Sequence, residues 1–333
     1  MMLRLNHKMI RNIIFMGTPK FAVPTLERLI EKQYTPCLVV TQPDKPQGRN
    51  MMLKPTPVKE VAVKNGITSF QPVDINSEES VKYINSFNPD IIITVAYGAY
   101  LGKKHRTMCP YGAINLHPSL LPKHRGADPV RSTLLNGDNV CGFSVFFITA
   151  KMDSGNIITK REYLVNGMNY TELSDFLAEN GADEIINTIA ILESKENKYK
   201  ELKDLFTIQD EESATYSKKV DKDSNRADFQ LKTIEFLCNV NAYSKEPGYY
   251  CFFRNKRIKL IDAELFDEEM NEVYPAVKRI EKSKGFVLSL KNGSLLIKEI
   301  QQEGKMQMNA YEFHKGARLE VGERFHSEEY NRN

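Results

Sequence analysis

Asn115 and His117 end an apolar stretch, and their types and spacing could support chemistry on a carbonyl group. On a regular strand, residues two apart point to the same face, while Leu116 between them points to the other. An amide and an imidazole at a strand end can grip a substrate carbonyl, and each donor that stabilises an oxyanion contributes about 3 kcal/mol. The pair therefore predicts a site for attack on a carbonyl, in which a protonated His117 stabilises the oxyanion.

Asp153 is the third candidate, in the turn-forming sequence AKMDSGNII that follows the apolar segment GFSVFFIT. If that segment is a strand beside the first, Asp153 can orient the imidazole, raise its pKa, or hold a water molecule that accepts a proton. Ser119 lacks the flanking glycines of a nucleophile elbow. The set therefore favours direct attack by an amine over covalent catalysis. Spacing alone does not decide this, because Asn-x-His and Asp-Ser-Gly are more often structural than catalytic.

Five apolar segments typical of strands occur in the first half of the chain: NIIFMG, PCLVVTQ, DIIITVAYG, GAINLH and GFSVFFIT. Helix-like segments such as AVPTLERLIEK and TPVKEVAVKNG lie among them. Hydrophobic strands that alternate with helices predict a mostly parallel, Rossmann-like sheet covered on both faces. Sites in such sheets lie beyond the carboxyl ends of the strands, where residues 115–126 are expected.

The second half of the chain has a different pattern. A long helical segment, TELSDFLAENGADEIINTIAILESKE, precedes the charged sequence SKENKYKELKDLFTIQDEES, which is typical of a linker. Several short strand-like segments follow, with the hairpin signal KNG. We therefore predict a catalytic domain over 1–195, a linker over 196–213, a small β-barrel over 214–326 and a tail over 327–333. Within the barrel, GYYCFF is expected to form core and not a base-stacking platform.

Composition narrows the class of protein. The 333 residues carry a net charge of +3, which is too small to predict nucleic-acid binding by itself. The five cysteines are scattered without a Cys-x-x-Cys spacing, which predicts reduced thiols in the cytoplasm and no metal site. No apolar run approaches the roughly 18 residues that a membrane span needs. The basic start, MMLRLNHKMIRN, is expected to be a ragged extension, with a transit peptide as the minor alternative.

The chain resembles the methionyl-tRNA formyltransferases. FMGTPKFAVPTL, TQPDKPQGR, VAYG, NLHPSLLPKHRGADPV and MDSGNII occur in the order found in that family, and ATYSKKVDKDSNRADF and GSLLIKEIQQEGKMQMNAYEFHKG resemble its C-terminal domain. The resemblance implies a Rossmann-like catalytic domain followed by an OB-like barrel that helps to hold tRNA. It also implies transfer of a formyl group from 10-formyltetrahydrofolate, without a metal, to the α-amine of methionyl initiator tRNA, by a monomer in the cytoplasm.

Individual roles also follow from the resemblance. Asn115, His117 and Asp153 match the catalytic trio. The residues expected to line the folate site are Ser119, Leu120, Leu121, Pro122, Val95, Ala96, Tyr97 and Gly98. The residues expected to bind tRNA are Arg49, Lys45, Lys54, Arg125, Lys218 and Lys219, and a further basic cluster comprises Arg254, Lys256, Arg257 and Lys259. The chain departs from the family pattern at NMML, where relatives often carry lysines, and at Asp128, where a small residue is common.

Three alternatives stay open. A sugar-nucleotide N-formyltransferase would share the trio, and a 10-formyltetrahydrofolate hydrolase would use water at the same site. The segments ATYSKKV and GKMQMNAYEF favour the tRNA enzyme over the sugar enzyme, and a hydrolase would not need a long barrel with basic clusters. A non-catalytic nucleotide-binding module could use the same sheet, but it predicts no joint role for the trio. Residues 17–19, Gly-Thr-Pro, predict a tight turn, because no Gly-Lys-Ser/Thr follows them.

Overall fold

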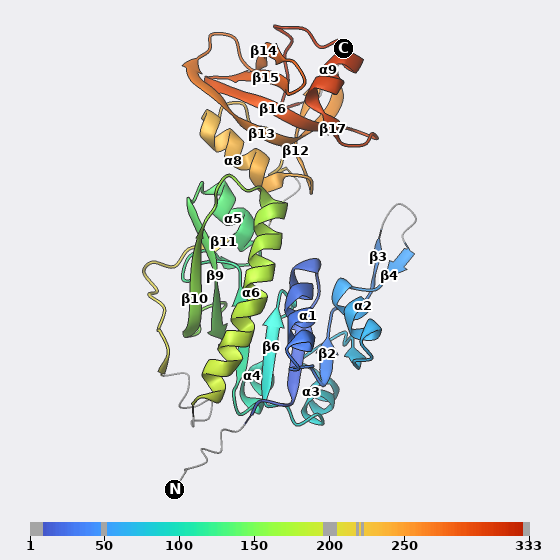
Figure 1. The fold of residues 1–333 in the computed structure, drawn as a ribbon, viewed down its shortest axis with the longest axis vertical. Coiled ribbons are helices and arrows are strands. Elements are labelled where there is room, and N and C mark those ends of the chain that lie inside the picture. The colour runs from blue at the N-terminus through green and yellow to red at the C-terminus, as the bar shows by residue number, and fades with distance from the viewer. Residues whose placement is uncertain (1–8, 48–51, 196–204, 218–219, 221–222, 329–333) are drawn as a thin grey trace. The chain divides into compact units, whose positions relative to one another are not determined.

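The computed structural model describes residues 9–47, 52–195, 205–217, 220 and 223–328 (Figure 1). Two compact units are present: the first comprises residues 1–129, 141–163 and 174–217, and the second comprises residues 130–140, 164–173 and 218–333. Residues 209–217, which the charged sequence assigned to a linker and to the start of the barrel, therefore belong to the first unit. Arg49, Lys218 and Lys219 lie outside the described residues, as do most of the predicted N-terminal extension and tail.

A seven-stranded sheet forms the centre of the first unit, with the strand order β10-β9-β7-β6-β1-β2-β5. The strands are β1 (Ile13–Gly17), β2 (Leu38–Val40), β5 (Ser69–Phe70), β6 (Ile91–Val95), β7 (Ala113–His117), β9 (Val140–Phe147) and β10 (Ile157–Leu164). Strands β5, β2, β1, β6 and β7 are parallel, and β9 is antiparallel to β7. Every residue of β1 and β6 is buried, as expected for strands covered on both faces. The predicted mostly parallel sheet is confirmed.

Helices connect and cover these strands. They are the short η1 (Lys20–Ala22), α1 (Val23–Glu31), α2 (Pro57–Lys64), α3 (Glu78–Asn85), α4 (Lys103–Met108) and α6 (Tyr170–Glu193). Helix α5 (Pro129–Leu135) precedes β9 in the chain and belongs to the second unit from residue 130 onward. Helix α6 approaches β7 closely, because a Cβ at Gly181 would lie 2.7 Å from the Leu116 side chain. Leu116 thus packs against α6, which leaves Asn115 and His117 on the opposite face of β7.

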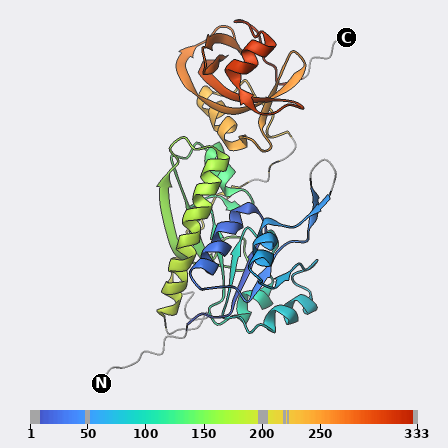
Figure 2. The ribbon, with the colours of Figure 1, turned by 45° about the vertical axis from the view of Figure 1, so that its right-hand side comes forward.

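A β-hairpin extends from the first unit in both views (Figure 1, Figure 2). It consists of β3 (Lys45–Gln47) and β4 (Met52–Lys54), which pair antiparallel. The register places Lys45 directly opposite Lys54, and both residues are exposed. Like charges directly opposite each other on a hairpin repel, so an anionic partner that lies between them is favoured.

The second unit contains an antiparallel sheet with the order β12-β13-β16-β15-β14, to which β17 adds beside β16. Its elements are α8 (Thr233–Tyr243), β12 (Tyr249–Phe253), β13 (Lys256–Met270), β14 (Ala276–Glu281), β15 (Gly285–Leu290), β16 (Asn292–Gln302), β17 (Met308–Asn309) and α9 (Ala310–Ala317). The predicted C-terminal β domain is confirmed, including the hairpin at the KNG sequence, where Leu290 pairs with Gly293. The prediction of short strands was wrong for β13 and β16, which have 15 and 11 residues.

Residues 323–326 link the two edge strands of this sheet. His326 pairs with Phe252 of β12, and Arg324 pairs with Ala276 of β14. Phe325, between them, stacks on Phe253 and Phe286 with ring centroids 5.1 and 5.5 Å apart. The segment therefore closes the sheet into a barrel around an aromatic core, which removes exposed edges.

The aromatic segment of β12 is divided between two faces. Tyr249, Cys251 and Phe253 are buried, as predicted for barrel core. Tyr250 is only half-buried and faces the other way, with the Arg257 guanidinium 3.7 Å above its ring. One face of β12 thus presents an aromatic ring and a cation together, which the prediction of core alone did not include.

Candidate active site

Asn115 presents its amide nitrogen at the end of β7. The Thr94 hydroxyl, on the neighbouring strand β6, donates to Asn115 Oδ1 over 2.7 Å. Because the amide oxygen is engaged, the nitrogen Nδ2 is the atom that can donate to a substrate oxygen. The side chain is partly exposed, so a ligand can reach it.

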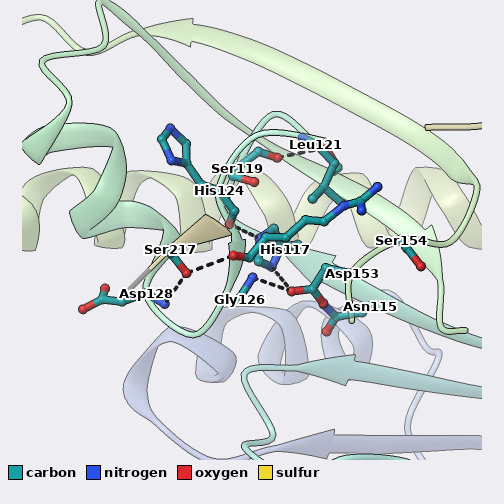
Figure 3. Close-up of polar contacts among 12 residues, drawn as sticks. Asn115, His117, Ser119, Leu121, His124, Gly126, Asp128, Asp153, Ser154 and Ser217 are labelled. Atoms are coloured by element: carbon teal, nitrogen blue, oxygen red, sulfur yellow. Dashed lines mark hydrogen bonds and ion pairs between the residues drawn. The ribbon is translucent and has the colours of Figure 1, made fainter. Parts of the chain in front are cut away.

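His117 is buried, with 4% of its surface exposed, and its two ring nitrogens have different surroundings. Nε2 lies 2.9 Å from the carbonyl oxygen of His124, which can only accept a hydrogen bond, so Nε2 carries a proton. Nδ1 faces the Asp153 carboxylate, with Oδ2 at 3.8 Å (Figure 3). Burial lowers the pKa of His117, and the charge of Asp153 acts in the opposite direction.

The lowered pKa favours a neutral imidazole, in which Nδ1 is unprotonated because Nε2 carries the proton. The prediction of a protonated His117 did not include the effect of burial, which acts against that state. A neutral Nδ1 beside a carboxylate is suited to accept a proton, since the imidazolium that forms is then stabilised by the neighbouring negative charge.

Asp153 reaches this position through a loop that folds back. Strand β9 runs antiparallel to β7 and ends at Phe147, opposite Ile114, so the loop after it must return toward His117. Gly155 permits the return, because a Cβ there would lie 1.7 Å from the Phe147 carbonyl oxygen. The backbone N–H of Gly126 donates to Asp153 Oδ2 over 2.8 Å. The structure thus brings all three members of the predicted trio together.

The hydroxyl groups of Ser119 and Ser144 fix the segment after His117 through hydrogen bonds to its backbone. Ser119 Oγ donates to the Lys123 carbonyl over 2.6 Å, and Ser144 Oγ donates to the Ser119 carbonyl over 2.8 Å. Ser144 Oγ also accepts from the backbone N–H of Leu121 over 3.1 Å. Ser119 and Leu121 are buried, whereas Leu120 and Pro122 are partly exposed and are the members of this segment that a ligand can touch.

The VAYG segment is divided in the same way. Val95 and Tyr97 are buried, and Tyr97 belongs to the core cluster that includes Leu101. Burial raises the pKa of Tyr97 to about 12. Ala96 and Gly98 are exposed, with φ values of 47° and 86°. Only the latter two offer surface to a pterin ring, so folate contact by Val95 and Tyr97 would have to come from their backbone.

Arg125 does not lie where the tRNA prediction requires. Its surface exposure is 0%, and its guanidinium donates to the side chains of Gln209 and Glu211 over 2.8 to 3.1 Å. A basic residue is usually exposed, and distant partners that include Gln209 and Glu211 explain why this one is buried. Sequence reasoning missed both partners, because they lie in a charged stretch that is typical of a linker.

The described residues contain no group of three or more His, Cys, Asp and Glu side chains that could hold a metal. Within the same residues, no helix is long and apolar enough to cross a membrane. The site contains an amide donor, an imidazole and a carboxylate, which suit proton transfer and oxyanion stabilisation.

Comparison with known proteins agrees with this site. The family described as "Formyl transferase" matches residues 11–188, and "Formyl transferase, C-terminal domain" matches residues 219–318. The chain is 34% identical to the methionyl-tRNA formyltransferase of Sulfurihydrogenibium sp. over 94% of its own length and 99% of that protein. It is 35% identical to the enzyme of the same name from Agathobacter rectalis, again over 94% and 99% of the two chains.

Solved structures share the fold at low identity. An N-formyltransferase from Helicobacter canadensis, solved with folinic acid and dTDP-3-aminofucose, has a TM-score of 0.60 at 16% identity and covers 86% of this chain and 98% of its own. HypX from Aquifex aeolicus, solved with tetrahydrofolic acid, has a TM-score of 0.60 at 14% identity and covers 92% of this chain and 47% of its own. These structures show the shared fold, and the family match and the sequence relatives at 34 and 35% identity show that the chain belongs to the methionyl-tRNA formyltransferase family.

Proposed function

We propose that this protein transfers the formyl group of 10-formyltetrahydrofolate to the α-amino group of methionyl initiator tRNA. The observation that carries the proposal is the convergence of Asn115, His117 and Asp153 at the end of β7. It occurs in a chain that matches methionyl-tRNA formyltransferases over 94% of its length. The set contains an oxyanion donor and a base, and direct attack by an amine needs both.

The reaction follows from the positions of these groups. The methionine amine attacks the formyl carbon, and the charge that develops on the formyl oxygen is stabilised by the Nδ2 donor of Asn115. His117 Nδ1 accepts the proton that the attacking nitrogen loses, and the resulting imidazolium faces Asp153. The bond from the formyl carbon to N10 of the folate then breaks, and His117 returns the proton to N10. No other reactant is consumed.

Lys45 and Lys54 are the described residues best placed to contact the tRNA from the first unit. They lie opposite each other on the exposed β3–β4 hairpin, and neither forms an ion pair with another described residue. A phosphate group between them would relieve their repulsion. In the second unit, the Tyr250 ring under Arg257 offers a base-stacking surface beside a cation. We also propose that the enzyme acts as a monomer in the cytoplasm, where its five free cysteines would stay reduced.

A transfer assay with three acceptors tests the proposal. Purified protein and 10-formyltetrahydrofolate are mixed with methionyl initiator tRNA, methionyl elongator tRNA or a dTDP-amino sugar, and the formylated product is measured. We expect selective formylation of the initiator. Formylation of the sugar instead would assign the site to a sugar N-formyltransferase, and release of formate without an acceptor would assign it to a hydrolase.

A further inference from the structure

Gln209 makes an unusually complete set of contacts with the loop that carries Asp153. Its side-chain amide nitrogen donates to the carbonyl oxygens of Asp153 and Gly155, over 2.9 and 2.7 Å. Its amide oxygen accepts two hydrogen bonds from the buried guanidinium of Arg125. Gln209 is itself 5% exposed. A buried amide with both ends engaged is costly to disturb, because each lost partner leaves a polar group unsatisfied.

The contacts fall where the backbone is strained. Asp153 has a φ of 48°, in the left-handed region that a residue with a Cβ rarely adopts. Such conformations persist only where the surroundings hold them. The bond from Gln209 to the Asp153 carbonyl supplies such a restraint, and it lies on the residue whose carboxylate faces His117.

Thr215 restrains His117, the other member of the His117–Asp153 pair, through His124. Thr215 Oγ1 accepts the backbone N–H of His124 over 2.8 Å, and the carbonyl of His124 accepts Nε2–H of His117. His124 also has a left-handed φ, of 56°. Two residues along, Ser217 pairs with Gly126, whose backbone N–H donates to Asp153. Figure 3 shows His124, Gly126 and Ser217 around His117 and Asp153.

We propose that residues 209–217 form a positioning segment for the reacting pair, in which Gln209 sets Asp153 and Thr215 sets His117 through His124. Both residues act through their neighbours and are positioning residues, not catalytic ones. Arg125 anchors the segment, because it bonds to Gln209 and Glu211 while its backbone N–H donates to the Thr215 carbonyl over 2.9 Å. The kinetic part of this inference rests on the proposed function; the part that concerns the His117–Asp153 pair does not.

The two substitutions Gln209→Met and Thr215→Val test this role in the full-length protein. Each substitution nearly preserves the volume of the side chain and removes its hydrogen-bonding groups. In Gln209→Met, Arg125 keeps its two hydrogen bonds to Glu211. The control is Ile208→Ala, because Ile208 lies in the adjacent position with 77% of its surface exposed. His117 ionisation is followed by NMR titration of the imidazole, which needs no substrate, and formylation of methionyl initiator tRNA is measured in parallel.

We expect the pKa of His117 to fall in both variants and to stay unchanged in the control. The charge of Asp153 and the bond to His124 both raise this pKa against the effects of burial and of the His124 ring, and each variant weakens one of them. We also expect kcat to fall at least about tenfold in each variant, with the KM for folate within about twofold of the wild-type value, since a misplaced reacting group slows the reaction more than it weakens binding.

An unchanged His117 pKa in both variants would overturn the inference, as would wild-type kcat values. A loss of kcat accompanied by an equal loss of folate affinity and an unchanged pKa would show general disruption and count equally against it. If the wild-type protein does not formylate tRNA, the proposed function fails, and the NMR titration still decides the inference. If Gln209→Met does not fold, Thr215→Val decides it by the same two measurements.

Discussion

Asn115→Ala isolates the oxyanion donor with little disturbance of the fold. Asn115 is partly exposed, and the Thr94 hydroxyl that bonds to it also donates to the Ile114 carbonyl over 3.1 Å. Removal of the side chain therefore leaves no buried hydroxyl without a partner. The loss of one preorganised donor costs about 3 kcal/mol of transition-state stabilisation. At 1.36 kcal/mol for each factor of ten, the transfer rate should fall by a factor of order 10².

Thr94→Val provides a graded comparison. It keeps the Asn115 amide but removes the bond of 2.7 Å that fixes its orientation. Its effect should be smaller, about tenfold, because the donor is still present but less well aligned. Single-turnover formylation of methionyl initiator tRNA under saturating folate measures both rates. The reasoning is refuted if Asn115→Ala retains a near-normal rate, or if Thr94→Val is the more damaging change.

Three further predictions follow from the same geometry. Burial lowers the pKa of His117, and His117 must be unprotonated to act as a base. We therefore expect kcat/KM to fall only as the pH drops below about 6.5, the ordinary pKa of histidine, and a fall that begins at higher pH would contradict a neutral resting imidazole. Gly155→Ala should lower the free energy of unfolding by about 1–3 kcal/mol in denaturant titrations, because the new Cβ meets the Phe147 carbonyl and the loop must shift. An unfolding free energy equal to that of the wild-type protein would show that the loop can move without cost. Lys45→Ala and Lys54→Ala should each raise the KM for tRNA and reduce the slope of its salt dependence by about one, with the KM for folate unchanged. An equal rise in the KM for folate would place the hairpin at the folate pocket.

The sheet was predictable because it depends on local patterns, whereas the trio was a set of candidates that only the resemblance to the formyltransferases selected. Asn115 and His117 are two residues apart on one strand, and continuous apolar segments identify buried strands without any knowledge of their partners. Asp153 was predictable as a candidate but not its route to the site, since the antiparallel direction of β9 is a property of the whole sheet.

The supporting contacts were not predictable, because they join distant positions. Gln209 donates hydrogen bonds to Asp153 and Gly155, which precede it by 56 and 54 positions in the sequence. Ser217 bonds to Arg125 and Asp128, which precede it by 92 and 89 positions. A charged segment has no periodicity that marks it as part of a domain, so residues 209–213 were assigned to a linker and residues 214–217 to the start of the barrel. The prediction of a protonated His117 left out burial, which lowers the pKa of the imidazole and depends on the tertiary structure.

The closure of the barrel in the second unit also depends on contacts that could not be predicted from the local sequence. The strands of the barrel were recognisable from composition, but the segment that joins its edges, residues 323–326, contributes only single bridges to β12 and β14. Its role depends on Phe325, which completes the aromatic core with Phe253 and Phe286. A single aromatic residue near the C-terminus gives no sequence signal for that position.

The central claim is that this site moves a formyl group from folate to methionine, with His117 as the group that transfers the proton. The most direct test is the single-turnover rate of formyl transfer to methionyl initiator tRNA by the wild-type protein and by His117→Ala. We expect the wild-type protein to formylate the α-amine and the variant to do so at least about 10²-fold more slowly, with folate still bound. Equal rates in the two proteins, or no transfer by the wild-type protein, would contradict the account.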